Sequence, residues 1–213
     1  MSRLLLDDQY EKMPWDLLDN IVFDVGNVLL SFQPKQVLEE LFPGDSALEQ
    51  TIYERVFRSP YWVMLDHGTI SVQDAVRAMA AHRPDLEAPI AYLMDNWIDL
   101  KETIPEGIEA LHTAKEKGKK LYVLSNYHDA GFEHVYRKYP FFRLFDGLVV
   151  SSRVKLLKPD PAIYRTLIET FRLNPSRTLF IDDTPQNVET ALMEGWQGFC
   201  LNRTGRLHVF ITV

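Results

Sequence analysis

The chain has 213 residues, 46% of them hydrophobic and 12% aromatic, which is enough to bury a sizeable core in one domain with an insertion or in two small domains. Lysine and arginine total 23 against 30 aspartate and glutamate residues, and this acidic balance argues against a nucleic-acid partner while allowing a small phosphorylated ligand. Cys200 is the single cysteine, which excludes an internal disulfide and a multi-cysteine metal site.

Residues 1–20 predict an arm that carries no chemistry. Tyr10 and Leu18 can dock on a core, and the short apolar run Leu4–Leu6 is too brief for a leader peptide. No stretch approaches the ~20 apolar residues that a membrane helix needs. Together with the lone cysteine, this predicts a cytoplasmic protein without a membrane partner.

Residues 21–29 predict the strand around which the fold is built. Its apolar, β-branched run is interrupted by Asp24-Val25-Gly26-Asn27, a pattern typical of a buried parallel strand that ends in a carboxylate. Open α/β sheets bind their ligands at that end of their strands. Asp24 is therefore the first catalytic candidate, although an aspartate there can also simply cap a turn.

Residues 33–101 predict a helical module inserted after this strand. The signals are a stop at Pro43-Gly44, a capping box from Ser46, a turn at 66–69, a helix cap at Ser71 and a helix over 85–97. A module in this place is expected to cover the sheet edge as a lid. The alternative is a helical decoration without a role in the site.

From residue 105 onward, helices alternate with short apolar strands. The helices are predicted over 105–117, 129–139, 161–171 and 185–194, and the strands over 121–124, 147–150, 178–181 and 198–201, the last of the chain. This alternation predicts an α/β fold, a Rossmann-like doubly wound parallel sheet. Residues 1–32 and 102–213 then form the core, and residues 33–101 form the inserted helical cap.

Polar residues follow three of the predicted strands: Asp24, the pair Ser125-Asn126 and the pair Asp182-Asp183. A parallel sheet brings these strand ends to one edge. Converging carboxylates repel one another unless a cation lies between them. Carboxylate oxygens are hard ligands, so the sequence predicts a Mg²⁺ site at this edge.

Four ordered motifs carry a family resemblance: Phe23–Leu29, Leu124–Asn126, Lys158–Pro161 with Ile163-Tyr164, and Phe180–Asn187. In this order, over about residues 20–202, the chain resembles the haloacid dehalogenase-like superfamily of phosphohydrolases. The Asp-x-Gly-Asn-Val wording and the short helical insert look like subfamily IA, in the branch of the sugar phosphatases and the epoxide-hydrolase N-terminal domain. The resemblance implies the strand order 5-4-1-2-3, with the strand at residue 21 central.

The resemblance also implies roles for the acidic residues. Asp24 would be the nucleophile that forms an aspartyl-phosphate. Mg²⁺ would be held by Asp24, the backbone carbonyl of Gly26 and Asp182, with Asp183 binding directly or through water. As alternatives, Asp182 and Asp183 can act only as a helix N-terminal cap.

Three further residues would bind the phosphate. By resemblance, Ser125 and the backbone of Asn126 would hydrogen-bond its oxygens, and Lys158 would neutralise the transferring charge and orient the nucleophile. The implied activity is Mg²⁺-dependent hydrolysis of a small phosphorylated molecule such as a sugar phosphate. A turn at residues 125–126 and a surface lysine at 158 are the alternatives.

Gly26 departs from the family pattern, because most of these phosphatases carry a second aspartate there as general acid. Its loss is expected to lower the rate by ~10²–10⁴ on alkyl phosphates and least on sugar 1-phosphates, whose leaving hydroxyl is more acidic. Asp66 or His67 of the module, or His128 after the second strand, can supply the missing group.

Two other functions stay open at this stage. The superfamily's dehalogenases also lack the second acid, but they need no Mg²⁺ and their last motif does not resemble Asp182-Asp183. A catalytically weak module that binds a phosphorylated metabolite or a protein is the main alternative to the phosphatase. The sequence leaves the substrate and the oligomeric state open.

Overall fold

The computed structural model describes residues 2–5, 15–201 and 208–212 and arranges them around a seven-stranded sheet of order β1-β7-β6-β5-β2-β3-β4. The strands are β1 (Ser2–Leu5), β2 (Asn20–Phe23), β3 (Lys120–Ser125), β4 (Gly147–Val150), β5 (Thr178–Asp182), β6 (Gln197–Cys200) and β7 (His208–Thr212). Strands β2 to β6 run parallel, and β2 lies between β3 and β5. The expected fold class and the expected order of these five strands, with β2 central, are confirmed.

Strands β1 and β7 were not predicted. They pair antiparallel with each other, Ser2 opposite Thr212, and β7 also pairs antiparallel with β6. Residues 2–5 are therefore a strand and not part of an arm, and the strand that contains Cys200 is not the last. Their pairing joins opposite ends of the chain, which no local pattern reveals. Leu18 is buried in the core as expected, whereas Tyr10 lies outside the described residues.

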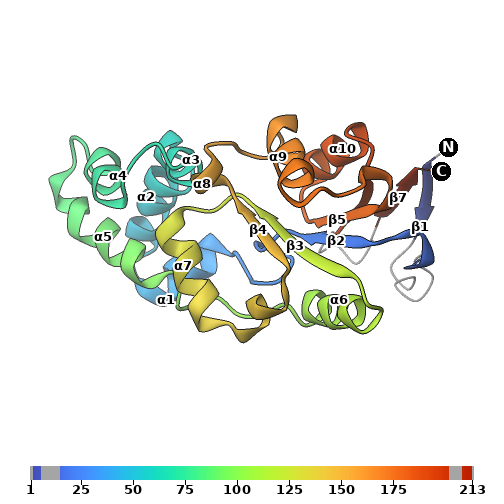
Figure 1. Cartoon of the computed structure of the whole chain (residues 1–213). Coiled ribbons are helices and arrows are strands. Elements are labelled where there is room, and N and C mark those ends of the chain that lie inside the picture. Colours follow the sequence, from blue (N-terminus) through green and yellow to red (C-terminus); the bar gives the residue numbers. More distant parts are fainter. Residues whose placement is uncertain (1, 6–14, 202–207, 213) are drawn as a thin grey trace.

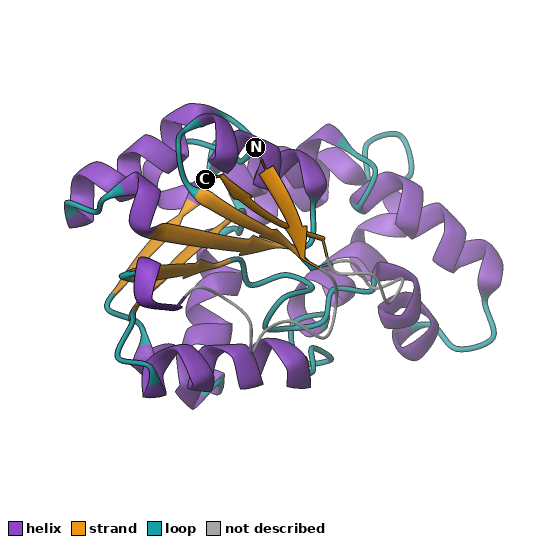
Figure 2. Ribbon diagram, turned by 90° about the vertical axis from the view of Figure 1, so that its right-hand side faces the viewer, coloured by secondary structure: helices purple, strands orange, loops and turns teal. Residues whose placement is uncertain are grey.

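The helices lie on both faces of the sheet and beyond one of its ends (Figure 1). They are α1 (Pro34–Leu41), α2 (Ser46–Val56), α3 (Pro60–His67), α4 (Val72–Met79), α5 (Glu87–Asn96), α6 (Pro105–Glu116), α7 (Asp129–Lys138), α8 (Ser151–Val154), α9 (Pro161–Phe171) and α10 (Pro185–Met193). Helices α6 and α7 lie on one face and α9 and α10 on the other (Figure 1), and the turned view shows the same layers (Figure 2). None of the helices in the described ranges combines the length and the apolar character that a membrane crossing needs.

The alternation of side chains along each strand feeds two apolar layers. Ile21 and Phe23 of β2 belong to the layer beneath α6, whereas Val22 belongs to the layer beneath α9 and α10. All three are fully buried. A strand that is apolar on both faces is what a sheet covered by helices on both sides requires.

Helix α3 corrects the prediction for the inserted segment. Asp66 and His67 do not lie in a turn but form the end of α3, which stops at Gly68 with φ of 71°. The helix begins with Ser59 as N-cap and Pro60 at the first position. Serine at the N-cap followed by proline at the first position is a known start signal, so this helix could have been predicted from the sequence.

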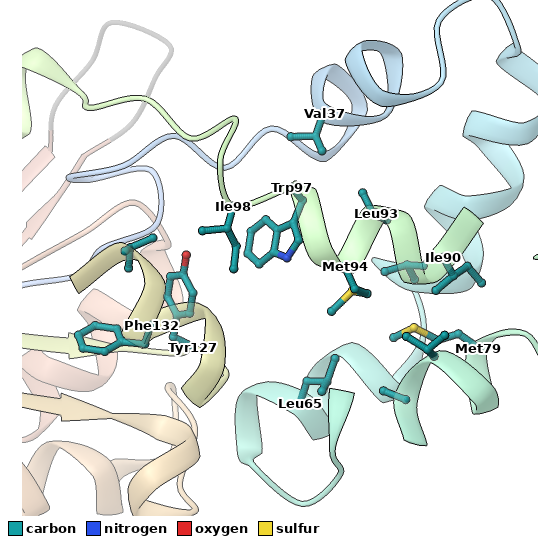
Figure 3. Close-up of a cluster of buried hydrophobic side chains, with 14 of the residues drawn as sticks. Val37, Leu65, Met79, Ile90, Leu93, Met94, Trp97, Ile98, Tyr127 and Phe132 are labelled. Atoms are coloured by element: carbon teal, nitrogen blue, oxygen red, sulfur yellow. The ribbon is translucent and has the colours of Figure 1, made fainter. Parts of the chain in front are cut away.

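Helices α1 to α5 lie together beyond one end of the sheet (Figure 1). An apolar cluster continues from the core into these helices, from Phe132 and Tyr127 beside the sheet to Met79 and Ile90 (Figure 3). Trp97, 2% exposed, lies between the two groups. The inserted helices thus share their hydrophobic core with the sheet domain.

The packing around Trp196 gives a stability prediction. This side chain is 1% exposed and makes edge contacts with the rings of Tyr164 and Phe180. We expect Trp196→Ala to lower the free energy of unfolding by about 3–5 kcal/mol because it leaves a cavity. Met193→Ala, three residues away but 75% exposed, should change it by less than about 0.5 kcal/mol. Urea denaturation measures both, and similar midpoints for the two variants would contradict the packing argument.

Candidate active site

Three carboxylates meet where β2 and β5 end. Asp24 follows β2, Asp182 ends β5 and Asp183 comes next, and each offers an oxygen within 4.8 Å of the others. The parallel register of the two strands pairs Phe23 with Ile181, so the residues that follow are neighbours. The Asp24 N–H continues the ladder by donating to the Ile181 carbonyl at 2.9 Å.

Lys158 lies between two of these carboxylates. Its Nζ is 2.9 Å from Asp24 Oδ1 and 2.6 Å from Asp182 Oδ2, and its side chain is 1% exposed. Asn126 at the end of β3 fixes the lysine backbone, because its Nδ2 donates to the Lys158 carbonyl at 2.9 Å and its Oδ1 accepts the Lys158 N–H at 2.8 Å. Lys158 is therefore a buried ion-pair partner and not a surface lysine.

The charges of this cluster do not balance. The pKa of Asp24 is raised to about 6, because burial and the neighbouring charges of Asp182 and Asp183 together outweigh the opposing effects of Lys158 and Ser125. Burial also raises the pKa of Asp183. Burial opposes the charged form of Lys158, but the carboxylates outweigh it and raise the lysine pKa. Three carboxylates with one lysine leave an excess of negative charge on hard oxygen donors, which fits a divalent cation such as Mg²⁺.

Hydrogen bonds hold Asp182, the last residue of β5, and Asp183, which follows it, in place. Asn187 donates from Nδ2 to both oxygens of Asp182, at 3.0 and 3.1 Å, and the Thr184 N–H donates to Oδ1 at 2.8 Å. Asn27, whose φ of 54° is left-handed, donates from Nδ2 to Asp183 Oδ2 at 3.0 Å. The sequence analysis assigned no role to Asn27 or Asn187, although both stand within the motifs that it quoted.

The hydroxyl groups of Ser125 and Thr184 are both bonded within the carboxylate cluster. The Ser125 hydroxyl donates to Asp24 Oδ1 at 2.7 Å and so addresses the expected nucleophile directly. Thr184 occupies the N-cap position of α10 without a side-chain capping bond, and its hydroxyl donates to Asp183 Oδ1 at 3.3 Å. Both side chains therefore contact the carboxylates.

Gly26 lies beside Asp24 and has free space around it. A Cβ atom at this position would have no other atom within 4 Å, apart from its chain neighbours. The fold therefore does not require glycine here for steric reasons. The place where the family's second carboxylate is expected opens into a pocket instead.

This pocket has a volume of about 200 Å³. It is lined by Asp24, Gly26, Asn27, Phe32, Trp62, Asp66, Trp97, Lys101, Asn126, Tyr127, Asp183 and Thr184. The rings of Phe32, Trp62 and Trp97 contact one another, with centroids 5.3 to 5.9 Å apart. The pocket thus has an acidic floor from the sheet and an aromatic wall that includes side chains of the inserted helices.

Lys101 is a pocket residue that the sequence analysis missed. It is 5% exposed, and its Nζ donates to the Ser31 carbonyl at 2.8 Å and lies 4.8 Å from the Phe32 ring centroid and 4.9 Å from that of Trp97. Burial lowers its pKa to about 7, although the charges of Asp24 and Asp66 act in the opposite direction. No local signal distinguishes this lysine from the other lysines of the sequence.

The three candidates for the missing acid occupy different places. Asp66 lines the pocket, whereas His67 does not. His128 is buried, caps α7 by accepting the Gly131 N–H on Nδ1 at 3.2 Å, and borders a different groove. Burial lowers the His128 pKa to about 4.

Comparison with known proteins finds a hydrolase family and a related phosphatase. A family model for haloacid dehalogenase-like hydrolases matches residues 18–193. The sesquiterpene phosphatase astK of Aspergillus oryzae is 22% identical over 180 residues, which cover 84% of this chain and 88% of that protein. Several other curated relatives are matched over less than half of their own length.

Solved structures show the same fold. The family enzyme bt-2542 of Bacteroides thetaiotaomicron, in complex with magnesium and inorganic phosphate, matches with a TM-score of 0.67 at 19% identity, over 86% of this chain and 93% of that one. The L-2-haloacid dehalogenase RSc1362 matches with a TM-score of 0.68 at 24% identity, over 88% of both chains. The fold alone therefore does not separate a phosphatase from a dehalogenase.

The ion pairs of Lys158 give the second prediction. In Mg²⁺-free buffer, Lys158→Met should lower the free energy of unfolding by about 3–5 kcal/mol, because it leaves two buried carboxylates without their cation. Lys117→Met, at an exposed position after α6, is the matched control and should stay within about 0.5 kcal/mol of the wild type. Chemical denaturation measures both, and a fully stable Lys158→Met variant would show that the pairs do not hold this edge together.

Proposed function

Because the chain belongs to the haloacid dehalogenase-like hydrolase family, we propose that it hydrolyses small phosphomonoesters such as sugar phosphates, with Asp24 as nucleophile and Mg²⁺ as cofactor. The observation that carries the proposal is the cluster of three carboxylates around one buried lysine at the floor of a pocket. A cluster with this charge suits a phosphoryl group together with a metal ion.

The residues of the chain divide the work as follows. An Asp24 oxygen attacks phosphorus, the bond from phosphorus to the ester oxygen breaks, and water later attacks the aspartyl-phosphate to release inorganic phosphate. Lys158 holds Asp24 by its ion pair, and Ser125 orients it by its hydrogen bond. The amide N–H of Asn126 is proposed to bind a phosphate oxygen.

Mg²⁺ would be held by Asp24, the carbonyl of Gly26 and Asp182, with Asp183 held nearby by Asn27. When bound, Mg²⁺ would neutralise negative charge on the phosphoryl group and on the carboxylates. The tandem Asp182-Asp183 at this site favours phosphate chemistry over dehalogenation.

The size and lining of the pocket support a small substrate. About 200 Å³ leaves room for a small metabolite over the carboxylates. Residues 33–101 are proposed to act as the cap, because Trp62 and Trp97 form part of the pocket wall and would contact the leaving group. These aromatic side chains would then select among substrates.

The activity is tested by phosphate release from a panel of phosphorylated metabolites with Mg²⁺ and with EDTA. We expect release by the wild type only with Mg²⁺, loss to background in Asp24→Asn, and loss of the Mg²⁺ response in Asp182→Asn. Asp95→Asn, at an exposed position on α5, is the control and should retain full activity.

Two results would contradict the proposal. Turnover that survives in Asp24→Asn would remove the nucleophile assignment. Saturable binding of a phosphorylated metabolite by the wild type without any release would support the binding-module alternative instead.

A further inference from the structure

The pocket above Asp24 contains an acid that the carboxylate cluster does not use. Among its described lining residues, Asp66 is the one acidic side chain outside the cluster of Asp24, Asp182 and Asp183. It comes from α3 in the inserted helices and shares the pocket with Gly26 of the sheet domain, where no side chain projects.

We propose that Asp66 is the general acid and base of the hydrolysis and takes the place of the carboxyl group that Gly26 lacks. The inference rests on the proposed function, since it assigns a residue to that reaction. It moves the proton-transfer group from the loop after β2 to helix α3, which contributes to the same pocket.

Contacts with the sheet domain fix the position of Asp66. The Asp66 carbonyl accepts a hydrogen bond from the Ser151 hydroxyl, and the backbone N–H of His128 lies close enough to the carboxyl group to lower its pKa. Two residues on, the Gly68 carbonyl accepts from Lys155 Nζ. The end of α3 is thus bound to α8 and to the segment after β3. Asp66 is held in place before a substrate arrives, as proton transfer requires.

The surroundings give this carboxyl group a suitable proton affinity. The surroundings together raise the Asp66 pKa to about 7: burial has the largest effect and the Asp24 charge acts in the same direction, whereas the His128 N–H and the Lys101 charge act against them. Tyr127, the other titratable neighbour, is itself buried, and its pKa is raised well above the ordinary value. An acid with a pKa near neutrality can both donate and accept a proton at pH 7.

The other candidates fit less well. His67 lies outside the pocket lining, and His128 is buried and already bonded to the Gly131 N–H. Lys101 faces the pocket, but its Nζ already donates to the Ser31 carbonyl and lies against two aromatic rings. Asp66 is the candidate whose side chain reaches the pocket without serving as a helix cap.

The proton passes from Asp66 to the leaving group and is replaced from water. As an Asp24 oxygen bonds to phosphorus, the bond from phosphorus to the leaving oxygen breaks, and that oxygen takes the proton of the Asp66 carboxyl group. In the second step the Asp66 carboxylate takes a proton from water. The water oxygen then attacks phosphorus and displaces Asp24, which releases inorganic phosphate and restores both side chains.

The test compares two leaving groups in the full-length Asp66→Asn variant. Asparagine keeps an acceptor for the His128 N–H but cannot exchange a proton. We expect the steady-state rate on a hexose 6-phosphate to fall by about 10²–10⁴-fold. With 4-nitrophenyl phosphate, whose leaving anion needs no proton, a rapid burst of one nitrophenolate per enzyme should remain and be followed by slow turnover. The controls His67→Gln and Asp95→Asn should behave like the wild type.

A second variant tests the chemistry rather than the position. Gly26→Asp places a carboxyl group at another position of the same pocket, where an added Cβ atom meets no other atom within 4 Å. Added to Asp66→Asn, this substitution should raise the rate on the hexose 6-phosphate at least tenfold over that of the single variant. Added to the wild type, it should change the rate little. Such a recovery would not occur if Asp66 only supported the fold.

The inference is overturned if Asp66→Asn keeps a rate on the hexose 6-phosphate within about threefold of the wild type, well short of the loss expected for an acid. It is also overturned if the nitrophenolate burst of the variant falls by the same factor as its rate on the hexose 6-phosphate. Asp66 would then affect the position of Asp24 or the folding of the chain, and not proton transfer. Failure of the proposed function looks different, since the wild type itself would release no phosphate from either compound.

Discussion

The ion pairs of Lys158 with Asp24 and Asp182 are the interaction on which the site depends. Removing a lysine and two carboxylates from water is costly, and only close pairing with further hydrogen bonds compensates for it. Lys158 satisfies both carboxylates within 2.9 Å, and Asn126 holds its backbone. These bonds join the ends of β2, β3 and β5 and the segment before α9 into one polar unit. These bonds therefore set the distances between the carboxylates that could bind a metal ion.

The outline of this arrangement could be predicted from the sequence. Apolar runs that end in Asp24 and Asp182 indicate parallel strands, and parallel strands end at one edge. The detailed bonding could not be predicted, because it depends on side-chain directions between distant segments. The Ser125 hydroxyl donates to Asp24, and nothing in its local sequence specifies that direction. Asn187 was quoted within a motif, yet its bonds to Asp182 emerge only from the packing of α10.

Features that depend on long-range contacts were missed. Strands β1 and β7 pair the two ends of the chain and have no periodic signal to announce them. Lys101 becomes a pocket residue because the chain returns from α5 past Phe32. Asp66 was considered as one of several candidates, but its place at the end of α3 depends on Ser59 and Pro60, whose start signal was not used. The position of Lys101 therefore depends on packing between distant segments, whereas that of Asp66 at the end of α3 depends on a local start signal.

The apolar cluster in Figure 3 has a mechanical consequence for the enzyme. If the inserted helices swung outward as one body, Trp97 would part from Tyr127, and apolar surface would enter water at about 25 cal/mol per Å². A wide separation of the inserted helices from the sheet domain is therefore unfavourable in free energy. Ligands then enter and leave through smaller movements at the edge of the pocket. An entrance of this kind limits the width of the molecules that can reach the pocket, independently of the contacts that they make inside it.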